Sequence, residues 1–271
     1  MDVEIFAMGA ALGLYVGAGA LALAGLLPGA VARERLMLAL LAGGVALHAQ
    51  SLGLRWQRVG TGPFITMHEV ISSNVWSLSL VYLLAAWRWR VLRPAAAVVM
   101  PVLFVMIAWL LATDPSPGHQ PATYRTAWLW VHVGLGKVFL GCVLVAVGLA
   151  GVILLRAAGV RSPRLAALPD DARLENLAFR FMVVGFLFES LMLIAGALWA
   201  QDAWGRYWAW DPLETWAFLT WLSLAAFLHA RVAWPVRPPA AAAMVIAVFV
   251  LAFLTFFGVP FVSTAPHKGA V

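Results

Sequence analysis

Cysteine and charged residues are what this chain has least of. Cys142 is the only cysteine among 271 residues, so no disulfide and no CxxC redox pair can form within the chain. It lies in an apolar run, where a small buried thiol is the ordinary interpretation. Only 11% of the residues are charged, whereas 63% are hydrophobic. This composition excludes a soluble domain and indicates a membrane protein.

Long apolar runs define the expected fold. A membrane-spanning helix needs roughly 20 mainly apolar residues. Eight runs approach this length, at about 4–28, 35–54, 70–88, 94–112, 127–155, 176–200, 213–233 and 240–262. We therefore expect an all-α, polytopic membrane helix bundle of about eight transmembrane helices, surrounded by lipid. No long polar linker interrupts the chain, so one domain over residues 1–271 is expected. The first run lacks a basic leader and a clear cleavage site and is expected to be retained.

The basic residues predict the orientation of the bundle. Loops on the cytoplasmic side of membrane proteins are richer in Lys and Arg. One set of alternate loops contains eleven such residues: Arg33, Arg35, Arg88, Arg90, Arg93, Arg156, Arg161, Arg164, Arg173, Arg231 and Arg237. The other set contains five: Arg55, Arg58, Arg125, Arg206 and Lys268. Both termini are then expected on the outer face. The short basic loops account for the net charge of +6 without nucleic acid as a partner.

Tryptophan is concentrated in one stretch, WAQDAWGRYWAWDPLETWAFLTW, from Trp199 to Trp221. A membrane–water interface explains one or two indoles. The sequence Asp211-Pro212-Leu213-Glu214 has the pattern of a helix start, with Asp as N-cap and Glu returning a hydrogen bond to it. Both are structural interpretations, and neither needs a ligand.

These interpretations do not explain why Trp204, Trp208 and Trp210 crowd around Gly205 and Arg206. Such a segment could form a flat aromatic shelf, with the arginine meeting an acidic group. A large planar ligand with carboxylates, such as heme, would fit this shelf. From the residues alone, a helix start at the interface and a ligand shelf both remain open.

The segment WGRYWAWDPLETWAFLTWL resembles the tryptophan-rich WWD signature of the CcsA/ResC family. Members of this family are polytopic subunits of the system II cytochrome c synthase. The resemblance implies that heme b is carried to the outer membrane face, held at the WWD segment over 199–216, and attached to CxxCH motifs of apocytochrome c. It also implies a bacterial plasma membrane location and two further partners, a CcsB/ResB-type membrane subunit and a thiol-reducing thioredoxin-like protein.

A second segment, RWQRVGTGPFITMHE, partly resembles the family pattern GxxPxxNxxE. Pro63 and Glu69 have matching spacing, whereas Thr66 stands where the family usually has Asn. His68 stands where an aromatic residue is common. An ordinary external turn is the alternative, so the resemblance implies only a structural role or a contact with the edge of the heme.

Two of the six histidines are expected at the level of the tryptophan stretch. His132 lies near the start of the fifth apolar run, and His267 follows the eighth. Two neutral imidazoles at one level can take both axial positions of a heme iron. The resemblance points to the same pair, and it assigns Trp204, Arg206, Trp208, Trp210 and Asp211 to heme binding. His119 is on the same side, but its loop position favours exposure to solvent.

His229 resembles the intramembrane histidine of the family and is therefore a third candidate ligand of heme iron. It lies near the inner end of the seventh run, whereas His48 is about 20 Å from the inner end of its own helix. One iron does not easily join the two. We expect the second ligand at His229 to come from a partner subunit, with His48 as the alternative.

Two ionisable residues, Lys137 and Glu189, lie deep in apolar runs. Charges at that depth are costly and are usually paired. Because both are near the middle of their runs, they are expected to pair with each other.

Two other functions compete with heme handling. An electron-transfer membrane cytochrome of the b type would also need histidines, but it usually pairs them on the same helix, and no run here contains two. A heme-free assembly protein of the same fold would bind no heme. Heme attachment would need no nucleophile from this chain, because the thiols of apocytochrome c react. No catalytic residue is therefore assigned, although the chain is expected to work with its partner as a heme lyase.

Overall fold

The computed structural model describes residues 2–27 and 33–262, which form helices joined by loops without any strand. Within these described ranges, seven helices are long and apolar enough to cross a membrane. They are α1 (Asp2–Ala24), α2 (Glu34–Val59), α3 (Met67–Arg88), α5 (Ala127–Ala157), α7 (Asp171–Trp204), α8 (Pro212–Ala233) and α9 (Pro238–Phe253), which continues into η3 (Leu254–Gly258). Shorter helices are η1 (Arg90–Leu92), α4 (Ala96–Ala112), η2 (Ala122–Tyr124), α6 (Pro163–Ala166) and α10 (Val259–Val262).

Each of the eight expected runs forms a helix over most of its described residues, and the all-α membrane bundle is confirmed. The structure differs from the expected count of about eight spanning helices at one run. The run at 94–112 forms α4, which is 17 residues long and contains Pro101. A proline within a helix removes one backbone hydrogen bond and limits regular continuation. The described part of the chain therefore contains seven full spans and one shorter apolar helix.

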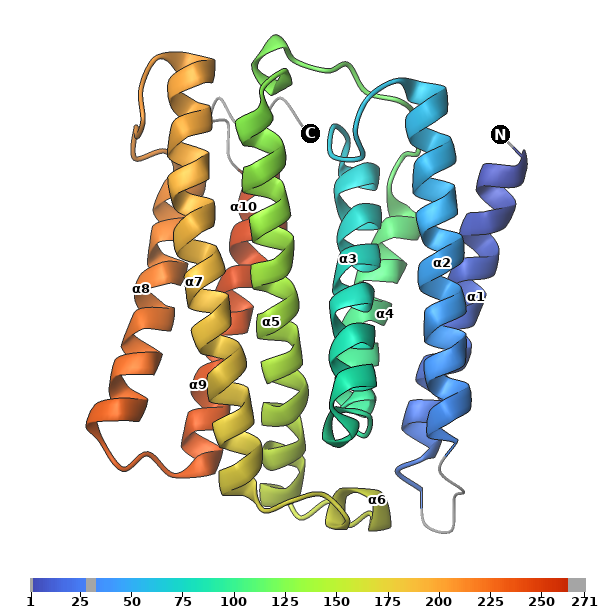
Figure 1. The fold of residues 1–271 in the computed structure, drawn as a ribbon, viewed down its shortest axis with the longest axis vertical. Helices are drawn as coiled ribbons and strands as arrows, with labels where there is room; N and C mark the ends of the chain where they lie inside the picture. Colours follow the sequence, from blue (N-terminus) through green and yellow to red (C-terminus); the bar gives the residue numbers. More distant parts are fainter. Residues whose placement is uncertain (1, 28–32, 263–271) are drawn as a thin grey trace.

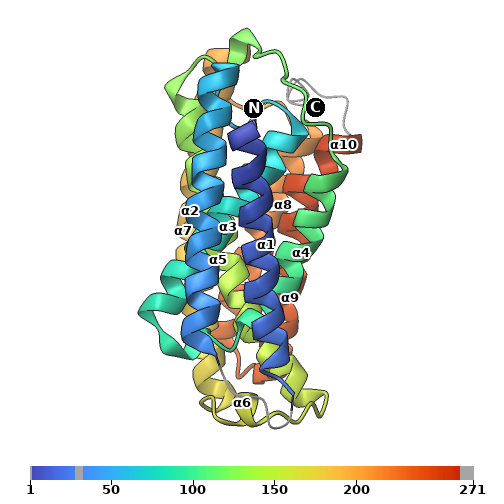
Figure 2. The same cartoon turned by 90° about the vertical axis from the view of Figure 1, so that its right-hand side faces the viewer.

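Helix α5 lies at the centre of the bundle. It packs against α3, α4, α7 and α9, and residues 139–150 are all buried. A helix that is apolar on every side is stable only when other helices surround it. Figure 1 shows α7, α8 and α9 on one side of α5 and α1 to α4 on the other. The quarter-turn view shows α1 and α2 side by side at the front of the molecule (Figure 2).

The two sets of loops lie at opposite ends of the bundle (Figure 1). The C-terminal ends of α1, α3, α5 and α8, which precede the loops with the larger set of arginines, lie at one end, called here the arginine-rich end. The tryptophan-rich loop between α7 and α8 lies at the other, together with the described start of α1 and the described end of α10. The assignment of these ends to the two membrane faces stays a prediction.

Buried ion pairs join α1, α2 and α3 near the end where the tryptophan-rich loop lies. The Nε atom of Arg55 donates to Oε1 of Glu69 at 2.9 Å, and its Nη1 lies 3.7 Å from Glu4. Arg58 donates twice to Glu4, at 2.7 and 2.8 Å. Glu69 also accepts the backbone N–H of Ile65 at 3.1 Å. These contacts replace water for charges that α1 to α3 would otherwise bury unpaired.

Glu69 also completes the start of α3. The Thr66 hydroxyl accepts the Glu69 backbone N–H at 3.3 Å, and the Glu69 side chain accepts the Thr66 backbone N–H at 3.3 Å. This capping box satisfies donors that have no partner inside the helix. His68 contacts Thr113 Oγ1 through Nδ1 at 3.1 Å. The segment that partly resembles GxxPxxNxxE therefore builds the end of the bundle through hydrogen bonds.

Candidate functional site

A pocket of about 180 Å³ lies between α5, α7, the start of α8 and the π-helical turn η3. Its walls are mainly apolar, and its polar side chains come from His132, Tyr207, Trp208, Glu214 and Thr255. Single π-helical turns are frequent at functional sites, because they displace residues from the regular helical positions. The pocket therefore joins α5 to the loop between α7 and α8, which contains Trp208 and Trp210.

His132 projects from the start of α5 into this pocket. Its Nδ1 atom lies 2.9 Å from the carbonyl oxygen of Met192 on α7. A carbonyl oxygen can only accept, so Nδ1 carries the proton and the lone pair of the neutral ring is on Nε2. The ring also lies 5.9 Å from the Trp199 ring, tilted by 32°. This geometry fixes the tautomer that a metal-binding imidazole uses.

A glycine provides the space for the His132 ring. A Cβ atom at Gly196 would lie 2.8 Å from Nδ1 and 3.0 Å from Cε1 of His132. Such distances are too short for real carbon contacts, so any larger residue there would move the imidazole. Gly196 and Met192 are four residues apart on one face of α7, where together they hold the ring.

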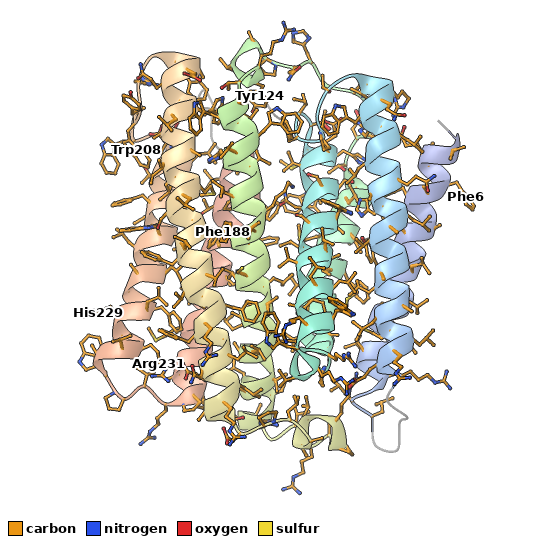
Figure 3. All side chains as sticks on the ribbon, in the orientation of Figure 1. Phe6, Tyr124, Phe188, Trp208, His229 and Arg231 are labelled. Atoms are coloured by element: carbon orange, nitrogen blue, oxygen red, sulfur yellow. The ribbon has the colours of Figure 1, made fainter. Side chains whose placement is uncertain are left out.

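The tryptophan-rich segment does not form the flat shelf that was one of its two interpretations. Trp208 and Trp210 meet edge to face, with 84° between their rings. Trp204 packs instead against Trp199, with 59° between the rings. Among these three candidates, only Trp208 lines the pocket, and Figure 3 shows its position on the loop between α7 and α8. The shelf prediction is wrong in its geometry.

The backbone explains why the indoles diverge. Gly205 ends α7 in the left-handed conformation, with φ of 71°. Trp210 is also left-handed, with φ of 58°, a strained conformation for a residue with a bulky side chain. The capping box of Asp211 and Glu214 then starts α8, as the sequence predicted, and Glu214 Oε2 also accepts the Ala209 N–H at 2.7 Å. Two left-handed turns around a fixed cap send successive indoles in different directions.

Two polar groups of this loop have no partner among the described residues. The Nε1 atom of Trp208 is buried and donates no hydrogen bond, although its ring lines the pocket. Arg206 is exposed and forms no ion pair with any residue in the described part of the chain. An acceptor in the pocket could take the indole hydrogen, and an acidic group at the surface could meet the guanidinium.

A second pocket, of about 190 Å³, shares His132, Trp199, Leu213 and Phe256 with the first. Lys137 lines it and donates to Ser73 Oγ of α3 at 2.9 Å. Both carboxylate oxygens of Glu189 are buried without a hydrogen-bond partner in residues 2–27 and 33–262. The expected pairing of Lys137 with Glu189 is therefore wrong. The two residues share a depth in the bundle, but the lysine faces α3.

Tyr124 lines the second pocket near the tryptophan-rich end of the bundle. It lies in η2, just before α5, and contacts the Trp199 ring edge to face at 5.6 Å. Burial raises the pKa of its phenol to about 12, so the group stays neutral at physiological pH. The Trp199 indole donates to the Thr123 carbonyl at 2.8 Å, which fixes η2 against α7.

The other candidate histidines lie apart from the first pocket. His229 is exposed on α8 and points away from the bundle near the arginine-rich end (Figure 3); its ring contacts Trp234 at 5.6 Å. His48 is fully buried, with Nδ1 3.3 Å from Tyr15 and Nε2 2.9 Å from Ser72. Both of its nitrogens are used, so His48 is not placed to be the second ligand beside His229. His267 lies outside the described residues.

Comparison with known proteins identifies the family. A family model described as cytochrome C assembly protein matches residues 65–267. The cytochrome c biogenesis protein CcsA of Synechococcus sp. (strain CC9605) is 32% identical over 229 residues, which cover 73% of this chain and 75% of the relative. CcsA of Prochlorococcus marinus (strain MIT 9515) is 30% identical over 249 residues, covering 81% and 79%. The chain belongs to the cytochrome c assembly family. The resemblance drawn from the tryptophan-rich segment is thus confirmed, and this family member is a multi-pass membrane protein.

A solved structure shares the fold of this cytochrome c assembly family member. The cytochrome c heme lyase CcmF matches with a TM-score of 0.71 at 20% sequence identity. The match covers 94% of this chain but 46% of CcmF, so the chain spans about half the length of that protein. At this identity the likeness shows the arrangement of helices.

Several residues of the site were not singled out by the sequence. No sequence motif includes Gly196, Met192 or Thr255. Their roles depend on how α7 and η3 are rotated about their axes in the bundle. One signal was available for the glycine. An isolated glycine inside a helix costs roughly 1 kcal/mol relative to alanine, and close packing is a common reason for it.

Proposed function

We propose that this protein takes part in cytochrome c maturation by carrying heme b to the tryptophan-rich end of the bundle and presenting it to apocytochrome c. The observation that carries the proposal is the hydrogen bond from His132 to Met192, which directs the Nε2 lone pair of a pocket-lining imidazole away from α7. Heme iron is one of the metal centres that a neutral imidazole binds, and a mainly apolar pocket suits a porphyrin. His267 is the second axial ligand in this proposal.

The side chains of the tryptophan-rich segment have separate roles. Trp208 offers its unpartnered Nε1 inside the pocket, and Arg206 meets a propionate from the surface. Trp204 and Trp210 act from outside the pocket, Trp204 through its packing against Trp199 and Trp210 through its edge-to-face contact with Trp208. Asp211 acts through its cap, which fixes the start of α8. The protein supplies positioning, while the cysteine thiols of a CxxCH motif add to the vinyl groups of the substrate.

His229 marks an earlier position of heme on the same route. It is exposed on the outer surface of α8, so a second protein chain can reach it directly. The second ligand there comes from a CcsB/ResB-type membrane subunit. A thiol-reducing thioredoxin-like protein keeps the apocytochrome cysteines able to react.

The test is co-expression of this chain with the partner subunit and an apocytochrome c, with heme-stained gels to score covalent heme. Covalent heme above the level without this chain is expected. The same membranes should show a low-spin spectrum, because imidazoles on both sides of iron give a strong ligand field. Formation of holocytochrome at the same rate without this chain would contradict the proposal.

The His229→Ala variant extends the same assay. We expect it to lose part of the low-spin absorption and most of the covalent heme, because heme no longer reaches the His132 pocket. His119→Ala, in an exposed loop at the other end, is the matched control and should keep both signals. A His229→Ala spectrum with all of the low-spin heme would remove this residue from the route.

Gly196→Ala tests the support of His132 without removing a ligand. The added Cβ at 2.8 Å from Nδ1 displaces the ring from the Met192 carbonyl. Loss of such supporting contacts usually lowers affinity about 10- to 100-fold, and a drop of this size in heme content is expected. Gly134→Ala on α5 is the control, since its Cβ meets nothing within 4 Å. Equal heme content in the two variants would contradict the positioning role.

A further inference from the structure

A cleft at the arginine-rich end contains a buried arginine with few partners. Arg164 lies in α6, and its side chain is only 9% exposed. Its Nε and Nη2 atoms are buried and donate no hydrogen bond to any residue in the described part of the chain. The Glu34 carboxylate, 3.6 Å from Nη2, is its ion-pair partner there. A guanidinium does not lose its proton in proteins, so this charge needs an acceptor.

The cleft has a volume of about 480 Å³ and is formed by four separate segments. Gly25 comes from the end of α1, Glu34 from the start of α2, Arg90 from η1 and Pro163 from α6. A Cβ atom at Gly25 would overlap Nη1 of Arg164, so the guanidinium lies directly against the bare backbone. The arginine is thus at the wall of a cavity and is not packed inside a helix interface.

The charges around the cleft do not balance. Arg90 lines it, and Nη1 of Arg93 lies 3.6 Å from Glu34. Arg93 and Arg164 therefore share one carboxylate, and Arg90 adds a third guanidinium to the cleft. Residues 28–32 read PGAVA and add no ionisable side chain. The end of α1 contributes about half a negative charge, which leaves a clear positive excess.

The segment that contains Arg164 is held in place by Arg156 of α5. The Arg156 guanidinium donates to the carbonyls of Pro169 at 2.8 Å and Leu168 at 3.1 Å, and also to that of Leu165. It pairs with Asp171 at 2.8 Å. This segment is fixed to α5 and α7, so Arg164 is already ordered before a ligand binds. Binding therefore avoids the entropy cost of ordering this side chain.

We propose that this cleft binds the phosphate group of an anionic phospholipid headgroup. Guanidinium groups match phosphate oxygens in charge and in their fork geometry. Trp87 and Trp89 are exposed at the same end, and such indoles are typical of the level of lipid headgroups. The cleft also has apolar walls, from Leu27, Val91 and Pro94, along which the lipid glycerol can lie.

The experiment uses the full chain purified in a neutral maltoside detergent and freed of lipid. Thermal unfolding is measured with dioctanoyl-phosphatidylglycerol, dioctanoyl-phosphatidylcholine and inorganic phosphate, each over a concentration series. We expect phosphatidylglycerol to raise the unfolding midpoint and the other two to leave it unchanged, because a ligand that binds only the folded state stabilises it. An equal rise with inorganic phosphate would assign the site to a free anion. An equal rise with phosphatidylcholine would show that the net negative charge of the headgroup does not determine binding. Either result overturns the proposal.

Three variants locate the effect. Arg164→Gln should weaken phosphatidylglycerol binding about tenfold, since a hydrogen bond to a charged group is lost. Arg161→Gln removes the same charge from an exposed position of the same loop and should bind as the wild type does. Glu34→Gln removes the competing carboxylate and should bind more tightly. Equal weakening by Arg161→Gln and Arg164→Gln, or weaker binding by Glu34→Gln, would contradict the proposed site.

Discussion

His132→Ala is expected to lower covalent heme attachment by a factor on the order of 100 or more, because an axial ligand is lost together with its supporting contact. The His132 imidazole lines both the first and the second pocket and packs beside Trp199. Alanine therefore leaves a space of imidazole size next to the 180 Å³ pocket. Free imidazole can enter that space, so millimolar imidazole should restore attachment.

The rescue separates a ligand role from a structural one. A variant that fails because α5 and α7 no longer pack correctly would not respond to imidazole. His267→Ala should behave like His132→Ala, since both ligate the same iron in the proposed site. His119→Ala, exposed in the loop before α5, should attach heme at the wild-type level. Full activity of His132→Ala without imidazole would exclude this residue as a ligand of the presented heme.

The helices and their starts were predictable because they depend on local sequence. Apolar length alone located all eight runs. The Asp211–Glu214 cap was also predicted, since its partners lie within one turn of the chain. Only α4 fell short of a full span, at 17 residues with an internal proline. Helix length and helix caps can be predicted without knowing how the other helices pack.

The site was less predictable because it depends on the rotation of each helix about its axis. Depth placed Lys137 and Glu189 at one level, but the lysine bonds to Ser73 and the glutamate has no hydrogen-bond partner in the described chain. The close approach of Gly196 to His132 could not be predicted for the same reason, because it depends on the rotation of α5 and α7. The angles between indoles were missed because Trp210 adopts a left-handed backbone that its residue type disfavours.

The partial resemblance around Glu69 left a structural role and a heme contact as alternatives. In the structure, the Glu69 carboxylate accepts from Arg55 and from the backbone of Ile65, and it is 1% exposed. Neither pocket beside His132 includes it among its lining residues. The geometry thus favours the structural role, which makes a prediction about stability.

Glu69→Ala should lower the free energy of unfolding by about 3–5 kcal/mol, the cost of leaving a buried partner charge uncompensated. Arg55 would retain only the longer contact to Glu4, at 3.7 Å, while its side chain is 7% exposed. The capping box of α3 would be lost as well. The measurement is unfolding of the purified protein in mixed micelles with increasing dodecyl sulfate.

Glu175→Ala is the matched control for the effect of burial. Glu175 also accepts from an arginine, with Nη2 of Arg231 at 2.7 Å, but this arginine side chain is 33% exposed. Water can replace the lost carboxylate there, so a smaller loss of about 1–3 kcal/mol is expected. Heme content per folded Glu69→Ala molecule should stay near that of the wild type. A large loss of heme at unchanged stability would instead place Glu69 in contact with the heme.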